Sequence, residues 1–198
     1  MIPGRRGGGR PRRPGTLTGG RQLNAGPLGS TVTVTTSIDE ARFAQMVGPL
    51  VGLPISAVWL GDYTALYLEI GPLTGVYRSG RPKAGHTAYL GFHWVLESDA
   101  GQELSSTEDG AAVRIGSALG GDRVAAVVVS PTCELALALS SRRRIRSVAS
   151  EPAEPEWALH LPSGSCIAVE NCSLVVESRA AQQGAAADRQ GPSSNGPR

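Results

Sequence analysis

The feature that most constrains the fold is an internal repeat, in which residues of like character recur 69 positions later along the chain. The repeated residues are mostly apolar, with one glycine in each copy. They pair as Met46 with Ile115, Leu50 with Leu119, Gly52 with Gly121, Ile55 with Val124, Val58 with Val127, Leu66 with Leu135, Leu68 with Leu137 and Ile70 with Leu139. At a spacing of 63 the match continues with Trp94 over Trp157, Leu96 over Leu159 and Gly101 over Gly164. The chain is therefore expected to use one structural unit twice.

Each copy opens with residues that are typical of a helix start. Ser37 with Glu40 forms a capping box, and Ser106 with Asp109 repeats it with a shorter acid. Apolar residues at helical spacing follow both caps, which predicts helices of about a dozen residues. A glycine then follows each predicted helix, where a left-handed residue commonly ends one.

Apolar runs and alternating segments after each helix predict β-strands. The predicted strands cover 55–60, 65–70 and 88–97 in the first copy and 124–129, 134–139, 156–161, 166–170 and 173–177 in the second. The expected fold class is therefore α+β and β-rich. It is an internally duplicated unit, a helix followed by about four antiparallel strands, used twice with pseudo-twofold packing. Two separate domains are the less favoured alternative, because a domain of about 65 residues is marginally stable alone.

The net charge of +2 conceals three differently charged segments. Residues 1–30 hold six arginines and no acid, residues 31–178 carry a net charge of −6, and residues 179–198 carry +2. The first segment is rich in glycine and proline and the last is of low complexity, so neither buries enough apolar surface to fold. We expect disordered tails at 1–30 and 179–198 around a single duplicated domain at 31–178, with halves 37–105 and 106–178.

Two interpretations of residues 1–30 remain open. An arginine- and glycine-rich arm would bind nucleic-acid phosphates, although this one has no aromatic residue to stack on bases. The interpretation that we favour is an unselected leader. If Val32 or Val34 is encoded by a GTG start codon, translation would begin there and the segment would not belong to the protein. The sequence has no run of 18 apolar residues and no apolar signal-peptide region. The expected location is the cytoplasm, with no membrane association.

The sequence contains none of the motifs that mark common active sites, such as a nucleophile elbow, a phosphate-binding loop, a zinc-protease helix or a dinucleotide fingerprint. Two candidate catalytic pairs, His93 with Glu69 and His160 with Cys166, rest on no diagnostic spacing. We therefore assign no catalytic residue and no cofactor, and we favour a protein that is not an enzyme.

The three cysteines, Cys133, Cys166 and Cys172, are odd in number and form no C-x-x-C pair. In a reducing compartment such residues behave as small buried apolar side chains. Zinc sites usually draw on ligands that are paired a few residues apart, and neither the cysteines nor His160 are paired in this way. We expect buried thiols, with neither a disulfide framework nor a metal site.

Arginines supply the candidate binding residues. Arg78 and Arg81 lie in a long polar segment, and Arg142, Arg143 and Arg144 form a basic cluster in the predicted domain. Such groups suit a phosphate or an acidic partner. A structural role is equally open, in which the cluster protects an edge strand from aggregation and nearby acids neutralise it. Those acids are Glu151, Glu154 and Glu156. The repeated tryptophans, by contrast, are expected in the core.

The succession Leu50-x-Gly52-x-x-Ile55, Leu66-x-Leu68-x-Ile70 and Trp94-x-Leu96 resembles small uncharacterised bacterial proteins of the domain-of-unknown-function type. The second copy, from Leu119-Gly-Gly121-x-x-Val124 to Trp157-x-Leu159-x-x-Pro-x-Gly164, resembles them more closely. The resemblance covers about 140 residues and implies a fold and no activity. Some small bacterial immunity proteins are similar in size and acidity.

The acidic domain, the repeat and the missing catalytic motifs favour a non-catalytic binding or interaction domain, immunity-like or regulatory, with a protein partner. Nucleic-acid binding through residues 1–30 is one alternative. An enzyme with an unrecognised site between the two halves is the other.

Overall fold

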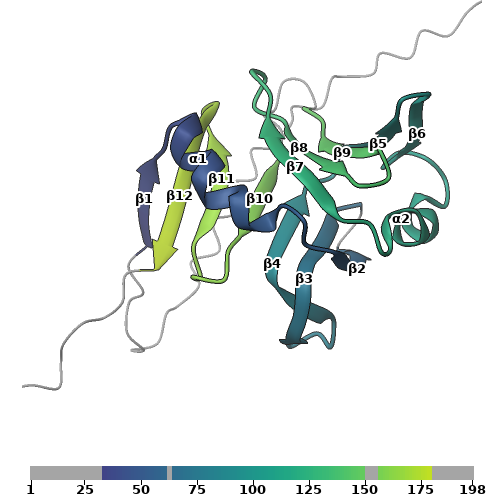
Figure 1. The fold of residues 1–198 in the computed structure, drawn as a ribbon, viewed down its shortest axis with the longest axis horizontal. Coiled ribbons are helices and arrows are strands. Elements are labelled where there is room, and N and C mark those ends of the chain that lie inside the picture. Colours follow the sequence, from purple (N-terminus) through teal and green to yellow (C-terminus); the bar gives the residue numbers. More distant parts are fainter. Residues whose placement is uncertain (1–32, 62–63, 150–155, 180–198) are drawn as a thin grey trace, which may run out of the picture. The chain divides into compact units, whose positions relative to one another are not determined.

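The computed structural model describes residues 33–61, 64–149 and 156–179 (Figure 1). The chain divides into two units, Met1–Ser30 and Thr31–Arg198, and every described residue belongs to the second unit. The tail predicted at 1–30 lies outside the described residues, as does all of the tail predicted at 179–198 except its first residue.

The larger of two antiparallel sheets has seven strands in the order β1-β12-β11-β10-β4-β3-β2. Its strands are β1 (Thr33–Ser37), β2 (Ile55–Leu60), β3 (Leu66–Val76), β4 (Pro82–Leu90), β10 (Trp157–His160), β11 (Cys166–Glu170) and β12 (Ser173–Arg179). The smaller sheet has five strands in the order β6-β5-β9-β8-β7. Its strands are β5 (Trp94–Ser98), β6 (Gly101–Ser105), β7 (Val124–Val129), β8 (Leu135–Leu139) and β9 (Arg144–Ser147). Together with two short α-helices, the sheets confirm the prediction of a β-rich α+β fold.

The first helix, α1 (Glu40–Val47), begins later than the sequence predicts. Asp39 is its N-cap and accepts a 2.7 Å hydrogen bond from the backbone N–H of Arg42. Ser37 is not a cap, because it is the last residue of β1 and pairs with Val175. A 3₁₀ turn, η1 (Gly48–Leu50), extends the helix, and Gly52 follows with a φ of +85°. The left-handed glycine that the sequence predicts after the helix is confirmed.

The second helix, α2 (Ala111–Leu119), also departs from the prediction at its start. Gly110 occupies the N-cap with a φ of +73° and no side chain caps the helix. Ser106 instead accepts a 3.3 Å hydrogen bond from the backbone N–H of Trp94. The predicted cap at Ser106 and Asp109 is therefore wrong. Gly121 beyond the helix again has a φ of +85°.

The predicted single strand at 88–97 is two strands in different sheets. The chain leaves the larger sheet after β4 and enters the smaller one at β5. The crossing point is Gly91, whose backbone N–H donates to Glu156 O at 2.7 Å. A Cβ on Gly91 would lie only 2.6 Å from the Cβ of Glu156, so glycine is required there. The apolar periodicity of the sequence continues across Gly91, and the sequence analysis therefore predicted one strand where the structure has two.

Two further strands, β1 and β6, are missing from the sequence prediction. β9 was considered only as an edge strand at the arginine cluster, and that position is wrong, because β9 pairs with both β5 and β8. β1 and β6 have little apolar content, with the sequences TVTTS and GQELS. β9 has one apolar residue, Ile145, between arginines. Such strands carry a weak period-two signal, and their pairing with neighbouring strands forms them.

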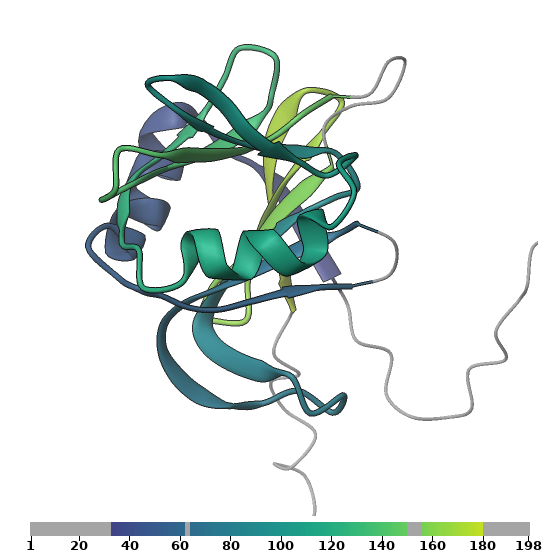
Figure 2. The ribbon, with the colours of Figure 1, turned by 90° about the vertical axis from the view of Figure 1, so that its right-hand side faces the viewer.

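One apolar core joins the inner faces of both sheets and the two helices. Trp94 and Trp157 are 1% and 3% exposed and belong to this core, as the sequence predicts. Helix α1 contacts β7. Helix α2 contacts β2 and β6 and faces the viewer in Figure 2. Among the described residues, no helix is long and apolar enough to span a membrane.

Two cysteines that were expected as thiols are joined in a disulfide. Cys133, in the turn between β7 and β8, bonds to Cys172, in the turn between β11 and β12, with a Cα–Cα distance of 5.6 Å. Cys166 is a free, half-buried thiol. The prediction of three buried thiols is wrong for the bonded pair. Both of its residues have a positive φ, in turns that the fold brings together, and their separation of 39 residues offers no sequence signal.

Candidate functional site

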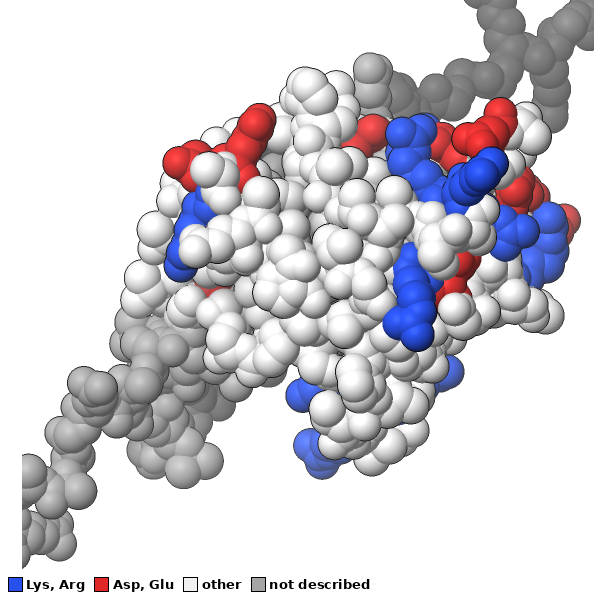
Figure 3. All heavy atoms as spheres, viewed as in Figure 1, with Lys and Arg blue, Asp and Glu red and all other residues white. Residues whose placement is uncertain are grey.

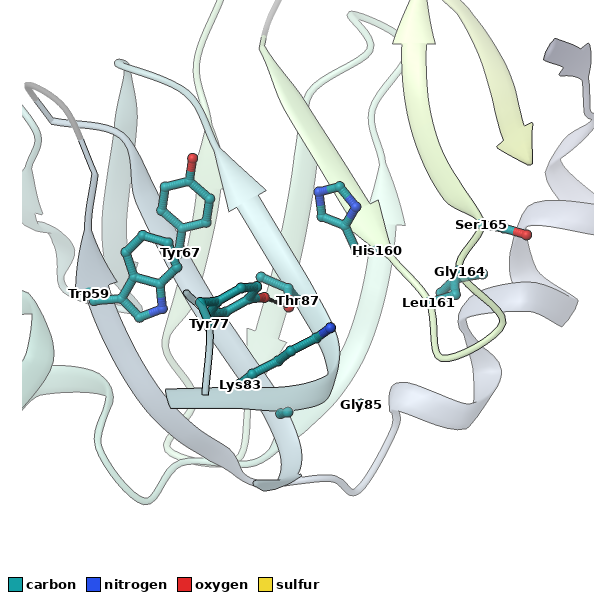
Figure 4. A pocket seen from close by; sticks show the side chains of 11 residues that line it. Trp59, Tyr67, Tyr77, Lys83, Gly85, Thr87, His160, Leu161, Gly164 and Ser165 are labelled. Atoms are coloured by element: carbon teal, nitrogen blue, oxygen red, sulfur yellow. Dashed lines mark hydrogen bonds between the residues drawn. The ribbon is translucent and has the colours of Figure 1, made fainter. Parts of the chain in front are cut away.

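A pocket of about 360 Å³ lies on the outer face of the seven-stranded sheet (Figure 4). Strand alternation places its side chains there, because Leu66, Leu68 and Ile70 of β3 point into the core while Tyr67 and Glu69 point outward. The pocket is lined by Trp59, Tyr67, Tyr77, Lys83, Ala84, Gly85, Thr87, His160, Leu161, Gly164 and Ser165.

Beneath the pocket lies Glu69, a carboxylate with no exposed surface. Its Oε2 accepts hydrogen bonds from the backbone N–H of Ala84 at 2.7 Å and the Thr87 hydroxyl at 3.1 Å. Its Oε1 accepts one from the Trp59 indole N–H at 3.3 Å. All three partners donate, which is the set that an ionised carboxylate requires. Glutamate is rarely buried without such partners, so Glu69 organises the wall and floor of the pocket.

The hydrogen bonds continue from Glu69 to the surface through two hydroxyl groups. The Thr87 hydroxyl donates to Glu69, so the Tyr77 hydroxyl, 3.0 Å from Thr87, donates to Thr87 in turn. Burial, and after it the negative charge of Glu69, raises the pKa of Tyr77. Tyr77 therefore keeps its proton at neutral pH.

Aromatic rings form the wall of the pocket. Trp59 and Tyr67 stack with their centroids 3.8 Å apart and their planes at 4°. Tyr77 meets Trp59 edge-on at 5.9 Å, and Tyr89 lies 5.1 Å from Tyr67 on the next strand. All four side chains are half-buried, which leaves part of each ring for a ligand.

The long β3–β4 hairpin carries Tyr77 back over the sheet. Its register shifts between Ile70 and Leu73 and again before Gly75, and Gly71 has a φ of +94°. Such irregularities bend a strand pair. Beyond the bend, the guanidinium carbon of Arg81 lies 5.8 Å from the Trp59 ring centroid, and Lys83 Nζ lies 5.4 Å from that of Tyr77.

His160 lines the side of the pocket opposite the hairpin, and Cys166 lies beside it on the neighbouring strand β11. They are opposite one another in the β10–β11 pair, so they share a face. Burial lowers the pKa of His160, against the raising effects of Glu69 and Glu177, and Lys83 lowers it further. Burial and Glu177 raise the pKa of the Cys166 thiol to about 11, so this cysteine is protonated at neutral pH and a poor nucleophile.

The other candidate catalytic pair is not assembled. His93 is exposed in the connection between β4 and β5, and the described partners of Glu69 are Trp59, Ala84 and Thr87. Within the described part of the chain, no three His, Cys, Asp or Glu side chains are placed to hold a metal ion.

The five predicted binding arginines fall into two separate groups. Arg78 and Arg81 are exposed in the β3–β4 hairpin beside the pocket. Arg142, Arg143 and Arg144 lie at the β8–β9 turn of the other sheet, and they line a second hollow of about 570 Å³. The structure therefore places only the first group beside the aromatic pocket.

Acids neutralise most of the second group, but they are not the acids that the sequence suggested. Arg143 pairs with Glu103 at 3.0 Å, and Arg144 pairs with Glu97. Arg146 bridges Glu97 at 2.9 Å and Glu134 at 3.2 Å. Of the suggested acids, residues 151 and 154 lie outside the described residues. Glu156 accepts a 2.7 Å hydrogen bond from the Tyr89 hydroxyl.

Sequence reasoning missed Trp59, Tyr67, Tyr77 and Thr87. It considered Glu69 only as a partner of His93, and Lys83 only as the end of a polar loop. One signal was present, since sliding the sequence by 69 residues places Ala138 over Glu69 and Val128 over Trp59. Where a large or charged residue in one copy aligns with a small apolar residue in the other, the position has a special role in the first copy. The hairpin residues had no such counterpart, because the second connection is shorter.

Comparisons with protein-family models, with curated proteins and with solved structures found no match to this chain. The function is therefore argued from the site itself.

Proposed function

We propose that this chain is a non-catalytic binding domain for a protein partner, and that it binds through the aromatic pocket of the seven-stranded sheet. The supporting observation is the half-exposed cluster of Trp59, Tyr67 and Tyr77 above a fully buried Glu69. Tryptophan, tyrosine and arginine dominate the energetic centres of protein interfaces. Here they lie together, with Arg81 over Trp59.

We also propose that the fold is an internal duplication with pseudo-twofold packing, with halves 37–105 and 106–178. Its support is that equivalent contacts recur at the two spacings of the repeat. The indole N–H groups of Trp94 and Trp157, 63 residues apart, donate to Thr64 O and Cys133 O, 69 residues apart, both at 2.7 Å. Each of the hairpins β2–β3 and β7–β8 has one register shift, at the same place.

Reciprocal backbone contacts between the halves support the same proposal. The N–H of Ile55 donates to Asp122 O at 2.7 Å, and the N–H of Val124 donates to Leu53 O at 3.0 Å. Self-complementary pairs of this kind are expected around a twofold axis. Each half also contributes strands to the sheet of the other, β5 and β6 from the first half and β10, β11 and β12 from the second.

Comparison of the two halves distinguishes residues that the strands require from residues that are specific to the pocket. Positions equivalent to Trp59, Tyr67 and Glu69 are Val128, Ala136 and Ala138 in the second half. The same strands therefore form without an aromatic cluster and without a buried carboxylate. We infer that these residues serve binding, because they are dispensable for the fold in the other half.

Two further predictions remain proposals. Nucleic-acid binding is confined to residues 1–30, which lie outside the described residues, and we keep it as the alternative function. A cytoplasmic location also remains a proposal, and the Cys133–Cys172 disulfide would instead suit an oxidising compartment.

A selection from a displayed library of random peptides tests the binding proposal. Clones that bind the native chain should lose at least about tenfold in affinity for Trp59→Ala, since central aromatic residues carry most of an interface's energy. Val128→Ala, at the equivalent position of the other sheet, is the matched control and should bind as the native chain does. Arg81→Ala is a second variant. It removes an exposed side chain beside Trp59, so it should weaken binding of the same clones while the fold stays intact. A selection that yields no clone dependent on Trp59 overturns the proposal.

A further inference from the structure

We propose that the pocket between Lys83 and His160 receives a carboxylate of an acidic segment of the protein partner. This inference rests on the proposed function and specifies the chemistry of the partner. An apolar or aromatic side chain of the same segment would lie on the ring surface formed by Trp59, Tyr67 and Tyr89.

The first argument is that the cations beside the pocket lack acidic partners. Among the described residues, no ion pair involves Arg78, Arg81 or Lys83, whereas Arg143 and Arg144 of the other sheet are both paired. Figure 3 shows the same contrast. Blue side chains without red neighbours lie at the lower end, where Figure 1 places the β3–β4 hairpin, and blue and red are intermixed around β5 and β9.

The second argument is that the pocket has no acid to compete for these cations. None of the residues that line the pocket is acidic. Glu69 beneath it is fully buried and hydrogen-bonded by three donors. Glu177 acts on His160 from outside the lining, since it pairs with Cys166 on the far side of that residue from His160. A ligand carboxylate would therefore meet Lys83 from the hairpin and His160 from β10, with Arg81 near the rim. Partly desolvated charge pairs of this kind fix the orientation of a partner.

The third argument is the shape of the pocket. Figure 4 shows Tyr77 and Lys83 on the hairpin side and His160 with the β10–β11 turn on the other. Two residues without side chains, Gly85 and Gly164, line the space between these walls. A side chain can therefore enter between the two walls.

The fourth argument favours a protein segment over a small anion. The aromatic surface continues beyond the pocket, from Trp59 on β2 through Tyr67 on β3 to Tyr89 on β4. Its far end is acidic, because Tyr89 donates to Glu156. A surface with an unpaired basic end, an apolar middle and an acidic end suits an extended segment that carries its acid at one end.

Two unlabelled pentapeptides test this inference by NMR titration of the isotope-labelled chain. The acidic probe is acetyl-Asp-Glu-Tyr-Gln-Asn-amide, which carries its acids at one end, and the neutral probe is acetyl-Asn-Gln-Tyr-Gln-Asn-amide. The acidic probe should shift the amides of Lys83, Gly85 and His160 and bind about tenfold more tightly than the neutral probe. Lys83→Gln should abolish this preference. Arg142→Gln, an exposed arginine on the other sheet, should leave it unchanged.

The outcomes separate this inference from the function on which it rests. Equal binding of both probes, with loss in Trp59→Ala, overturns the carboxylate assignment and leaves the binding function standing. Failure of Lys83→Gln to reduce the preference also overturns it. Inorganic phosphate that shifts the same amides as strongly as the acidic peptide shows a small-anion site instead. If neither peptide produces a shift that depends on Trp59, the binding function itself is contradicted.

Discussion

The outer faces of the two sheets use the same strand geometry for different chemistry. On the larger sheet, Tyr67 lies opposite Tyr89, and Glu69 lies opposite Thr87. On the smaller sheet, the central pair of strands places alanines opposite arginines instead. These pairs are Ala136 with Arg146 and Ala138 with Arg144. The first face encloses one buried carboxylate among aromatic rings, and the second exposes arginines that glutamates neutralise.

The difference shows that core and surface are under separate constraints. Inward residues of both faces are large and apolar, such as Leu68 and Leu137, each with no exposed surface. A core of fixed volume tolerates little change at such positions. The outward positions meet solvent, so they accept any side chain whose polar atoms are satisfied, and a site can be built there without altering the fold.

The largest expected effect concerns the disulfide, which ties the two sheets together. Its loss in the double variant Cys133→Ser with Cys172→Ser should lower the free energy of unfolding by about 3–4 kcal/mol, because the bond closes a loop of roughly 40 residues in the unfolded chain. Urea denaturation measures this difference. Cys166→Ser removes the unpaired cysteine and should change stability little. An unchanged midpoint in the double variant would show that the two turns do not depend on the bond.

The next effect tests whether the buried carboxylate belongs to one face only. Glu69→Ala leaves the Ala84 N–H and the Thr87 hydroxyl without their acceptor, so we expect a loss of about 2–3 kcal/mol in stability. The reciprocal change Ala138→Glu places a carboxylate beside Arg144 near solvent and should alter stability by less than about 1 kcal/mol. Thermal unfolding of both variants gives the comparison. Equal losses would contradict the distinction between the two faces.

The smallest effect is the response of the two faces to acid. Burial lowers the pKa of His160 below its usual value of 6.5. The imidazole of His160 therefore binds a proton more tightly in the unfolded chain than in the folded one. The contribution of His160 to stability is complete above pH 6.5 and is lost as the pH falls from there toward the folded pKa. Burial opposes ionisation of Glu97, but hydrogen bonds from Arg144 and Arg146 prevail and lower its pKa below 4.5. Its contribution is present above pH 4.5 and is lost as the pH falls through the folded value.

Stability measured from pH 8 to pH 3 separates these contributions. His160→Gln should flatten the curve below pH 6.5, and Glu97→Gln should flatten it below pH 4.5, each by less than about 1 kcal/mol because both groups are partly solvated. Burial also lowers the pKa of His86, so His86 contributes to the loss of stability below pH 6.5 in both variants. A curve that is identical in the native chain and in both variants would refute the assignment of these groups.

Local apolar patterning was sufficient for much of the fold. The strands at 55–60, 124–129 and 166–170 have the bounds that the sequence predicts, and both repeated tryptophans are in the core. Burial imposes a period on the residues that experience it, and that period can be read without knowing the neighbours.

Other features depended on contacts between distant residues. β4 ends before Gly91 because Glu156 lies against that glycine. Cys133 and Cys172 form a disulfide between two turns. Glu69 accepts a hydrogen bond from Ala84, which lies on the bent β3–β4 hairpin. Sequence alone determined which residues of this protein face the core, because alternation is a local consequence of burial. The tertiary structure alone decided where the chain crosses between sheets and which outward side chains meet, because those outcomes depend on strand pairing over long separations, which leaves no period in the sequence.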